Sequence, residues 1–296
     1  MTSLTSEIEK RLFRNFIIFH PSDFSAASEV AFAHALKIAL KSTAKLDLMH
    51  VKPPDHLGKS YWLNFPAIRA TLSRWQIWPE GGQRPEIAKA GLHIRKVLKP
   101  GVDPLETMLR HFEKYPPDLI VLATHQREGL DRWLHKAIAE PLARRSQTMT
   151  LFIPRTGKGF VALRDGTVSL KRVLIPIDQD PQPQIALREA WLLARGLGSV
   201  EGEFRLVHVG PAGTAPVVDR LELPGWSFER VVRQGSVVPG VLQEEADWKP
   251  DLIVLATQGH FGFLDALRGS TTERVLRGAC CPVLAVPAFN RQSSRL

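Results

Sequence analysis

Two glycines and two hydroxyl residues in the second half of the chain have types and a spacing that suit a phosphate group. Gly259 and Gly269 carry no side chain, so their backbone N–H groups can approach phosphate oxygens closely. Ser270 and Thr271 follow and open a predicted helix, whose free amides and dipole favour negative charge. These residues predict a phosphate-binding loop, although ordinary turns with an N-cap at Ser270 would use the same residues.

The ends of two other predicted strands supply groups that suit the rest of a nucleotide. Pro176 and Asp178 end one apolar run, and the Asp178 carboxylate can accept hydrogen bonds from ribose hydroxyls. Val209 ends another run and can offer apolar contact and backbone hydrogen bonds to a base. The P-loop pattern G-x-x-x-x-G-K-[ST] does not occur, and no carboxylate stands beside the glycines to hold magnesium. We hypothesise a nucleotide site beyond the carboxyl ends of these strands, where open parallel sheets bind ligands.

The strands that would position this site belong to a unit that occurs twice. The segment PDLIVLAT stands at 117–124 and again at 250–257. Its continuous apolar run is typical of a strand that is buried on both faces of a parallel sheet. Predicted helices alternate with such strands, for example over 104–112, where Asp103 is the expected N-cap. This alternation predicts a doubly wound α/β sheet in each half.

The duplication predicts two tandem domains joined by a linker. We expect the first domain over residues 12–156 and the second over 171–288. The linker, 157–170, contains Asp165-Gly166 between apolar runs, which predicts a hairpin.

The combination of these motifs resembles the universal stress protein family. The family pattern G-x2-G-x9-G-[ST] reads here as Ala256-x2-Gly259-x9-Gly269-Ser270, and the opening strand of each half ends in Pro-x-Asp. The resemblance covers nearly the whole chain as two tandem domains. It implies a Rossmann-like or flavodoxin-like α/β fold and a stress-response protein that binds ATP or another adenine nucleotide, with or without magnesium. Carried over by position, the residues implied to bind the nucleotide are Pro176, Asp178, Val209, Ala256, Gly259, Gly269, Ser270 and Thr271.

The chain departs from the family pattern at one position of the second half and at several of the first. Ala256 replaces the first glycine, and its extra methyl group is expected to weaken a contact without removing the site. In the first half, Gln126, Lys136 and Ala137 replace the two later glycines and the serine. A lysine attracts phosphate but does not reproduce a cradle of backbone N–H groups. We therefore expect the second half to bind the nucleotide and the first half to serve a structural role.

The resemblance also implies how the two halves meet. In the family, the fifth strands of two domains pair antiparallel and make a dimer. Here the segments at 151–154 and 283–287 can pair in the same way within one chain, which would form a pseudo-dimer and cover two sheet edges. A further homodimer of the tandem chain stays open.

The first half carries an insertion between its second and third predicted strands. Phe65, Ile68, Leu72 and Trp75 fall at helical spacing and predict one extra amphipathic helix, which the second half is expected to lack. An aromatic stripe of this kind serves packing or, less often, a lid over a ligand.

Composition favours a cytoplasmic globular protein. The chain has 296 residues, of which 44% are hydrophobic and 23% are charged, and no apolar run reaches the ~18–20 residues of a membrane span. The net charge of +9 is scattered, which favours a solvated basic surface over nucleic-acid binding. The two cysteines, Cys280 and Cys281, are adjacent and suit buried thiols in a reduced compartment.

No catalytic or metal-binding constellation stands out, so we expect slow ATP hydrolysis at most. His50 and His208 recur at strand ends, and recurrence in both halves favours a structural role. Glu140 and Glu273 also recur and are expected on helix surfaces.

The main hypothesis is a nucleotide-binding sensor or a docking module for a protein partner that the sequence does not identify. Two alternatives stay open. One is a scaffold with both sites inactive, which Ala256 favours, and the other is an enzyme of the adenine-nucleotide α-hydrolase type, which needs a further substrate domain.

Overall fold

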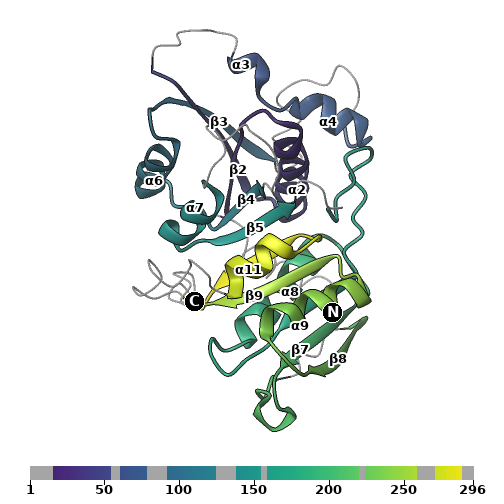
Figure 1. The fold of residues 1–296 in the computed structure, drawn as a ribbon. Coiled ribbons are helices and arrows are strands. Elements are labelled where there is room, and N and C mark those ends of the chain that lie inside the picture. Colours follow the sequence, from purple (N-terminus) through teal and green to yellow (C-terminus); the bar gives the residue numbers. More distant parts are fainter. Residues whose placement is uncertain are drawn as a thin grey trace.

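The computed structural model of the chain describes residues 16–54, 61–78, 92–124, 138–154, 159–219, 224–258 and 271–288. Their strands form a single 10-stranded sheet with the order β3-β2-β1-β4-β5-β10-β9-β6-β7-β8 (Figure 1). The strands of the first half are β1 (Ile17–Pro21), β2 (Lys45–Lys52), β3 (His93–Pro100), β4 (Leu119–Thr124) and β5 (Met149–Pro154). Those of the second half are β6 (Arg172–Pro176), β7 (Gly202–Val209), β8 (Trp226–Arg233), β9 (Leu252–Thr257) and β10 (Val283–Pro287).

The two halves meet where β5 pairs with β10, and this is the antiparallel pair of the sheet. Leu151 lies opposite Leu284, and Thr150 lies opposite Ala285. The pairing removes the edge that each half would otherwise expose at its fifth strand. The predicted α/β fold and the pseudo-dimer of tandem domains are therefore confirmed, while the domain boundaries stay predictions.

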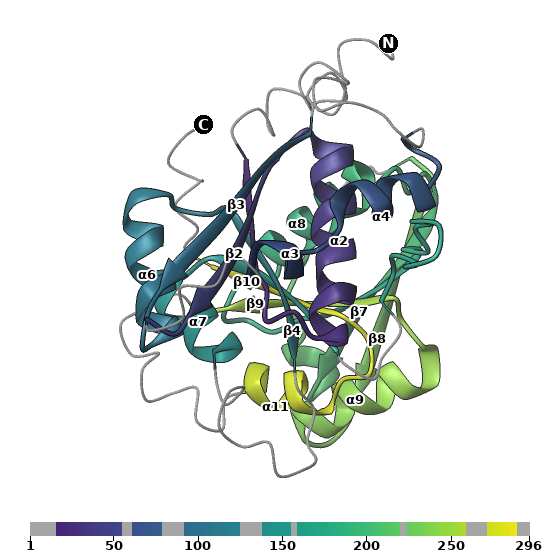
Figure 2. The same cartoon turned by 90° about the horizontal axis from the view of Figure 1, so that it is seen from above.

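Helices cover both faces of the sheet (Figure 2). One face carries α2 (Ala26–Ser42) and α8 (Gln184–Gly196). The other carries α6 (Pro104–Lys114), α7 (Ala139–Ser146), α9 (Val237–Trp248) and α11 (Thr271–Gly278).

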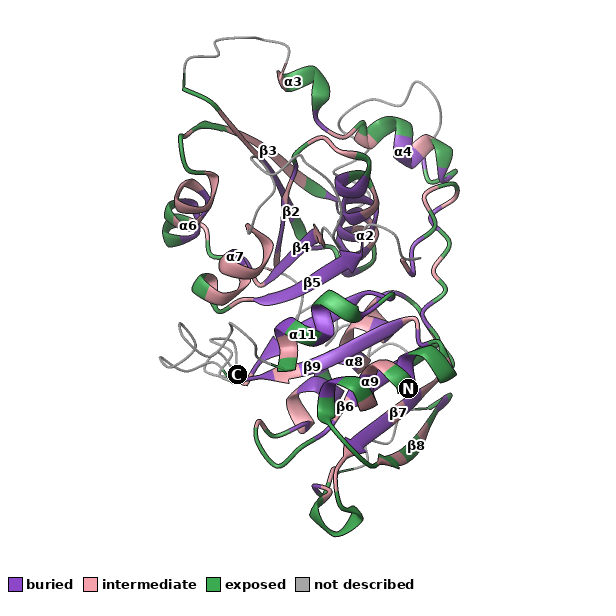
Figure 3. Cartoon of the chain, in the orientation of Figure 1, coloured by how far each residue is buried: buried purple, intermediate pink, exposed green. Residues whose placement is uncertain are grey.

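The strands are buried from both sides, as their unbroken apolar runs predict. In β6, Val173 and Ile175 join the core beneath α2 and α8, whereas Leu174 between them joins the core beneath α9 and α11. This follows from the alternation of side chains along a strand. The central strands are accordingly buried along most of their length in Figure 3.

The insertion differs from the single helix that its spacing predicts. It forms two short helices, α3 (Tyr61–Asn64) and α4 (Ile68–Arg74), and Phe65 lies between them. Pro66 explains the break, because a proline disfavours helical backbone at the residue before it. In the second half, the residues described between β7 and β8 hold one 3₁₀ turn, η1 (Ala212–Thr214), so the expected difference between the halves is present there.

The linker is fastened to the first half. Its hairpin is present: Val161 pairs with Val168, and Gly166 takes the left-handed conformation that the turn needs. The Val161 N–H donates to Nε2 of His34 in α2 at 3.1 Å. The indole Nε1 of Trp75, just after α4, donates to the Leu163 carbonyl at 3.1 Å. One task of the insertion is therefore to hold the linker.

Each half contains a charge cluster between its edge strand and the next strand, with the inner-strand residue largely buried, and the two clusters have opposite polarity. In the first half, Asp47 on β2 lies opposite Arg95 on β3 and forms an ion pair with it. In the second half, Arg205 on β7 lies opposite Glu229 on β8 and pairs with it. The same cross-strand position thus carries an acid on the inner strand in one half and a base in the other.

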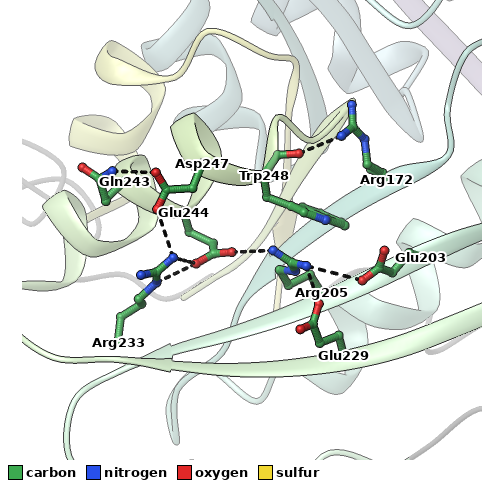
Figure 4. Close-up of polar contacts among 9 residues, drawn as sticks. All are labelled: Arg172, Glu203, Arg205, Glu229, Arg233, Gln243, Glu244, Asp247 and Trp248. Carbon is green, nitrogen blue, oxygen red and sulfur yellow. Dashed lines mark hydrogen bonds and ion pairs between the residues drawn. The ribbon is translucent and has the colours of Figure 1, made fainter.

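The helix above each cluster contributes one further side chain to it. His111 on α6 places Nε2 3.9 Å from the Asp47 carboxylate, whereas Glu244 on α9 accepts a hydrogen bond from Arg205 at 2.9 Å (Figure 4). Glu244 also accepts from Nε of Arg233 at 2.7 Å. Each helix therefore places a side chain against the inner-strand residue of its own half, an imidazole against an acid in the first half and a carboxylate against a base in the second.

Glu273 is not on the helix surface where the sequence placed it. Only 5% of the residue is exposed, and its carboxylate forms an ion pair with Arg277 one turn later in α11. Glu140 on α7 is half-buried; burial raises the pKa of its carboxyl, and the nearby charge of Glu273 raises it further. Both residues therefore lie where α7 and α11 approach each other across the junction of the halves.

Candidate functional site

The candidate crevice of the second half lies at the carboxyl ends of β6, β7 and β9. In the sheet, β6 has β7 on one side and β9 on the other. The chain leaves β6 toward the β7 side and returns on the β9 side, so this is a switch point in strand order. Loops diverge at such a point and leave room for a ligand.

Five of the eight predicted site residues are described, and the topology brings them to this edge. Pro176 and Val209 are the last residues of β6 and β7, and Ala256 is the last but one of β9. Asp178 follows β6 and is exposed, and Thr271 is the exposed first residue of α11. The other three predicted residues, Gly259, Gly269 and Ser270, lie outside the described residues, as do Gln126, Lys136 and Ala137 of the first half.

The side chain of Val209 packs against helix α9. A Cβ atom added to Gly240 in α9 would lie 2.9 Å from both methyl carbons of Val209, so the isopropyl group packs directly on that glycine. In the first half, a Cβ atom added to Gly101, in the loop after β3, would lie 3.0 Å from one methyl carbon of Val51. The end of the second strand is thus closely packed in both halves, by helix α9 in the second half and by the loop after β3 in the first.

The recurring histidines hold the Pro-x-Asp loops. Nδ1 of His208 lies 3.2 Å from the carbonyl oxygen of Ile177, the middle residue of the motif. Nδ1 of His50 makes the equivalent contact with Ser22, at 2.7 Å. Each ring ties the end of the second strand of its half to the loop after the first strand. This shared contact explains why His-Val is retained in both halves, as the structural hypothesis predicts.

Polar side chains that sequence reasoning did not select connect the loops around the candidate crevice. Nε2 of Gln258 donates to the Asp180 carboxylate at 2.5 Å, which joins the loop after β9 to the loop after β6. Nε2 of Gln179 donates to the Thr214 carbonyl at 3.1 Å, and Thr214 Oγ1 lies 3.0 Å from Nε2 of His208. The sequence marks these two glutamines only by their places next to predicted site residues. Gln179 directly follows Asp178, and Gln258 directly precedes Gly259.

The matching place in the first half is filled by aromatic rings. Phe24, the residue after the Pro-x-Asp motif, stacks on His50 with ring centroids 4.0 Å apart and an angle of 23° between the planes. Phe65 of the insertion meets the Phe24 ring edge-on at 5.5 Å, and Tyr61 stacks on His50 at 5.5 Å. The two halves therefore share the histidine but differ in what surrounds it.

The described residues show neither a metal-binding cluster nor a membrane-spanning helix. They contain no group of three or more histidine, cysteine, aspartate or glutamate residues that could hold a metal ion. No helix among them is long and apolar enough to cross a membrane.

Comparisons with known proteins point to one family. A sequence model of the universal stress protein family matches residues 17–154 and 212–287. Universal stress protein A homolog 2 from Coxiella burnetii (strain RSA 493 / Nine Mile phase I) is 38% identical over 60 residues, which span 20% of this chain and 40% of that protein.

Solved structures share the fold over the whole tandem arrangement. A universal stress protein from Archaeoglobus fulgidus DSM 4304 is 18% identical, has a TM-score of 0.61, and aligns over 92% of this chain and 96% of its own. A putative universal stress protein from Pseudomonas aeruginosa UCBPP-PA14 is 15% identical with a TM-score of 0.62, over 94% of each chain.

Proposed function

This chain belongs to the universal stress protein family, and on that premise we propose that its second half binds one adenine nucleotide, with ATP as the ligand. The supporting observation is that Pro176, Val209 and Ala256 end neighbouring strands at one switch point, with Asp178 and Thr271 exposed around it. Ligands of open parallel sheets bind at such a place. The proposed role is that of a stress-response sensor or docking module.

Each residue has a task that its chemistry suits. The Asp178 carboxylate accepts hydrogen bonds from ribose hydroxyls. The main chain at Val209 contacts the base, since its side chain packs on α9. Gly259, Gly269 and Ser270 surround the phosphates with N–H groups, and the start of α11 at Thr271 adds the positive end of the helix dipole. Ala256 weakens one contact with the nucleotide, because its methyl group stands where the family pattern has a glycine.

The biological setting is also a proposal. We place the protein in the cytoplasm, in keeping with two cysteines that form no disulfide. Nucleotide binding then changes how the chain meets a protein partner or a second copy of itself, which light scattering with and without ATP tests.

The test is calorimetric titration with ATP. Wild-type protein is expected to bind one ATP per chain, and Gly269→Lys, which copies Lys136 of the first half into the second, is expected to bind none. Lys136→Gly is the matched control and should leave the stoichiometry unchanged, because it lies in the other half. Circular dichroism checks that each variant keeps its fold.

Two results would contradict the proposal. No heat and no thermal shift with wild-type protein would favour the scaffold with both sites inactive. One ATP retained by Gly269→Lys would place the site elsewhere. Release of pyrophosphate that depends on a second substrate would instead support the α-hydrolase type of enzyme.

A further inference from the structure

The residue that follows the Pro-x-Asp motif differs between the halves, and in the first half it stacks on the second-strand histidine. In the first half it is Phe24, and in the second it is Gln179. The histidine holds the motif in the same way in both halves, through the carbonyl of its middle residue. The two halves therefore share the histidine contact that holds the motif, and they differ in the side chain of the residue that follows it.

Phe24 is held in an unfavourable backbone conformation. Its φ of 64° lies in the left-handed region, which bulky residues seldom adopt. Such strain persists only where the surroundings over-determine it. Here the surroundings are rings, because Phe24 lies flat on His50 at 4.0 Å and meets Phe65 edge-on at 5.5 Å.

The insertion completes the closure of the first half. Tyr61 on α3 stacks on His50 at 5.5 Å with 28° between the planes. Phe65, between α3 and α4, is buried. Two aromatic rings therefore stack on His50, and the insertion supplies one of them.

Among the described residues of the second half, no aromatic ring stacks on His208. The segment between Val209 and Trp226 contains no aromatic residue. Gln179 is exposed and donates to the Thr214 carbonyl, so its side chain runs toward η1. Thr214, whose Oγ1 lies 3.0 Å from Nε2 of His208, is also exposed.

We propose that Phe24 and the aromatic residues of the insertion fill the first-half crevice in place of a ligand, and that the residue after Pro-x-Asp decides whether a half is open. The inference rests on the proposed nucleotide site for its second-half test. It adds a cause for the inactive first half that is independent of the missing phosphate loop, since the base side of the crevice is closed as well.

The first experiment transfers the ring to the second half. Gln179→Phe is expected to stack on His208 and to weaken ATP binding by about tenfold or more, measured by calorimetry on the full chain. Gln179→Ser is the matched control, because it removes the same amide and its contact with Thr214 without adding a ring, and Gln179→Phe should bind ATP several times more weakly than this control. Equal affinity of Gln179→Phe and wild type, or equal weakening by both variants, would overturn the inference.

The second experiment tests the closure of the first half without any nucleotide. Full-length wild type and Phe24→Gln are treated briefly with diethyl pyrocarbonate, and modification of His50 is read by peptide mass spectrometry. His50 should react slowly in the wild type and several times faster in the variant. Equal reaction in both proteins would overturn the role of Phe24. Because this measurement uses no ATP, its outcome is separate from failure of the proposed function.

Discussion

Replacing Glu244 with glutamine removes one negative charge from a carboxylate of which only 1% is exposed, while keeping the size of the side chain. Glu244 accepts hydrogen bonds from Arg205 at 2.9 Å and from Arg233 at 2.7 Å (Figure 4). In the variant, the glutamine amide would offer one acceptor oxygen and one NH2 donor to two guanidinium groups. The NH2 group would therefore face at least one guanidinium N–H donor. Arg205, whose side chain is 18% exposed, would keep Glu229 as its partner but lose the buried one.

The expected cost follows from this burial. Breaking a buried ion pair by removing one partner costs about 3–5 kcal/mol, because the other charge stays in the interior. Since Arg205 keeps Glu229, we expect the lower end, a loss of about 3 kcal/mol in the free energy of unfolding. That is a large part of the stability of an ordinary protein, so urea unfolding followed by circular dichroism resolves it.

The matched control is Asp247→Asn. Asp247 contacts the same Arg233, but its side chain is 47% exposed, so its loss should have a small effect that shrinks further with added salt. The Glu244→Gln loss should persist in salt. If Glu244→Gln lowers the free energy of unfolding by less than about 1 kcal/mol, the cluster behaves as an exposed ion pair and the reasoning from burial is wrong.

Three further predictions concern the linker, acid stability and the site. Trp75→Ala removes a buried ring and its hydrogen bond to Leu163, and should lower the free energy of unfolding by about 3–5 kcal/mol in urea titrations, whereas Trp62→Ala, at a ring that is 49% exposed, should change it little. Burial lowers the pKa of His34 and of His20 from 6.5 to about 4, so the folded state stays neutral where the unfolded state takes up protons. Stability should therefore fall as the pH drops from about 6.5 to about 4, less steeply in His34→Gln, and equal unfolding midpoints at pH 7 and pH 4.5 would contradict this. Gly240→Ala places a methyl group against Val209 and should cost about 1–3 kcal/mol of stability and weaken ATP binding. Gly213→Ala, whose added Cβ would meet nothing within 4 Å, should do neither.

The parts of the fold that were predictable from sequence are those set by local pattern. Unbroken apolar runs predicted strands buried on both faces, and Val173 and Leu174 indeed lie in cores on opposite sides of the sheet. Asp103 caps α6 by accepting from the Glu106 N–H, as its place before Pro104 predicts. The apolar spacing of the insertion predicts one helix from Phe65 onward, but Pro66 separates Phe65 from the helix that follows it, α4.

The parts that were not predictable depend on partners that are far apart in the chain. The sequence of its own helix predicts Glu273 on the surface. It is buried because α7 of the other half lies nearby at the junction between the halves. Glu244 likewise becomes a core residue only because Arg205 and Arg233 arrive from two strands. For the site, the strand ends could be predicted from the motifs, whereas Gln179, Thr214 and Gln258 join it through contacts between loops that no local pattern marks.

Equilibrium dialysis of the purified full-length chain against labelled ATP tests the central claim most directly, because it counts sites without assuming where they lie. The account predicts saturation at one ATP per chain, which is lost in Gly269→Lys and kept in Lys136→Gly. Saturation at two per chain would show that the first half is open despite its aromatic residues, and no retained ATP would show that neither half is a nucleotide site.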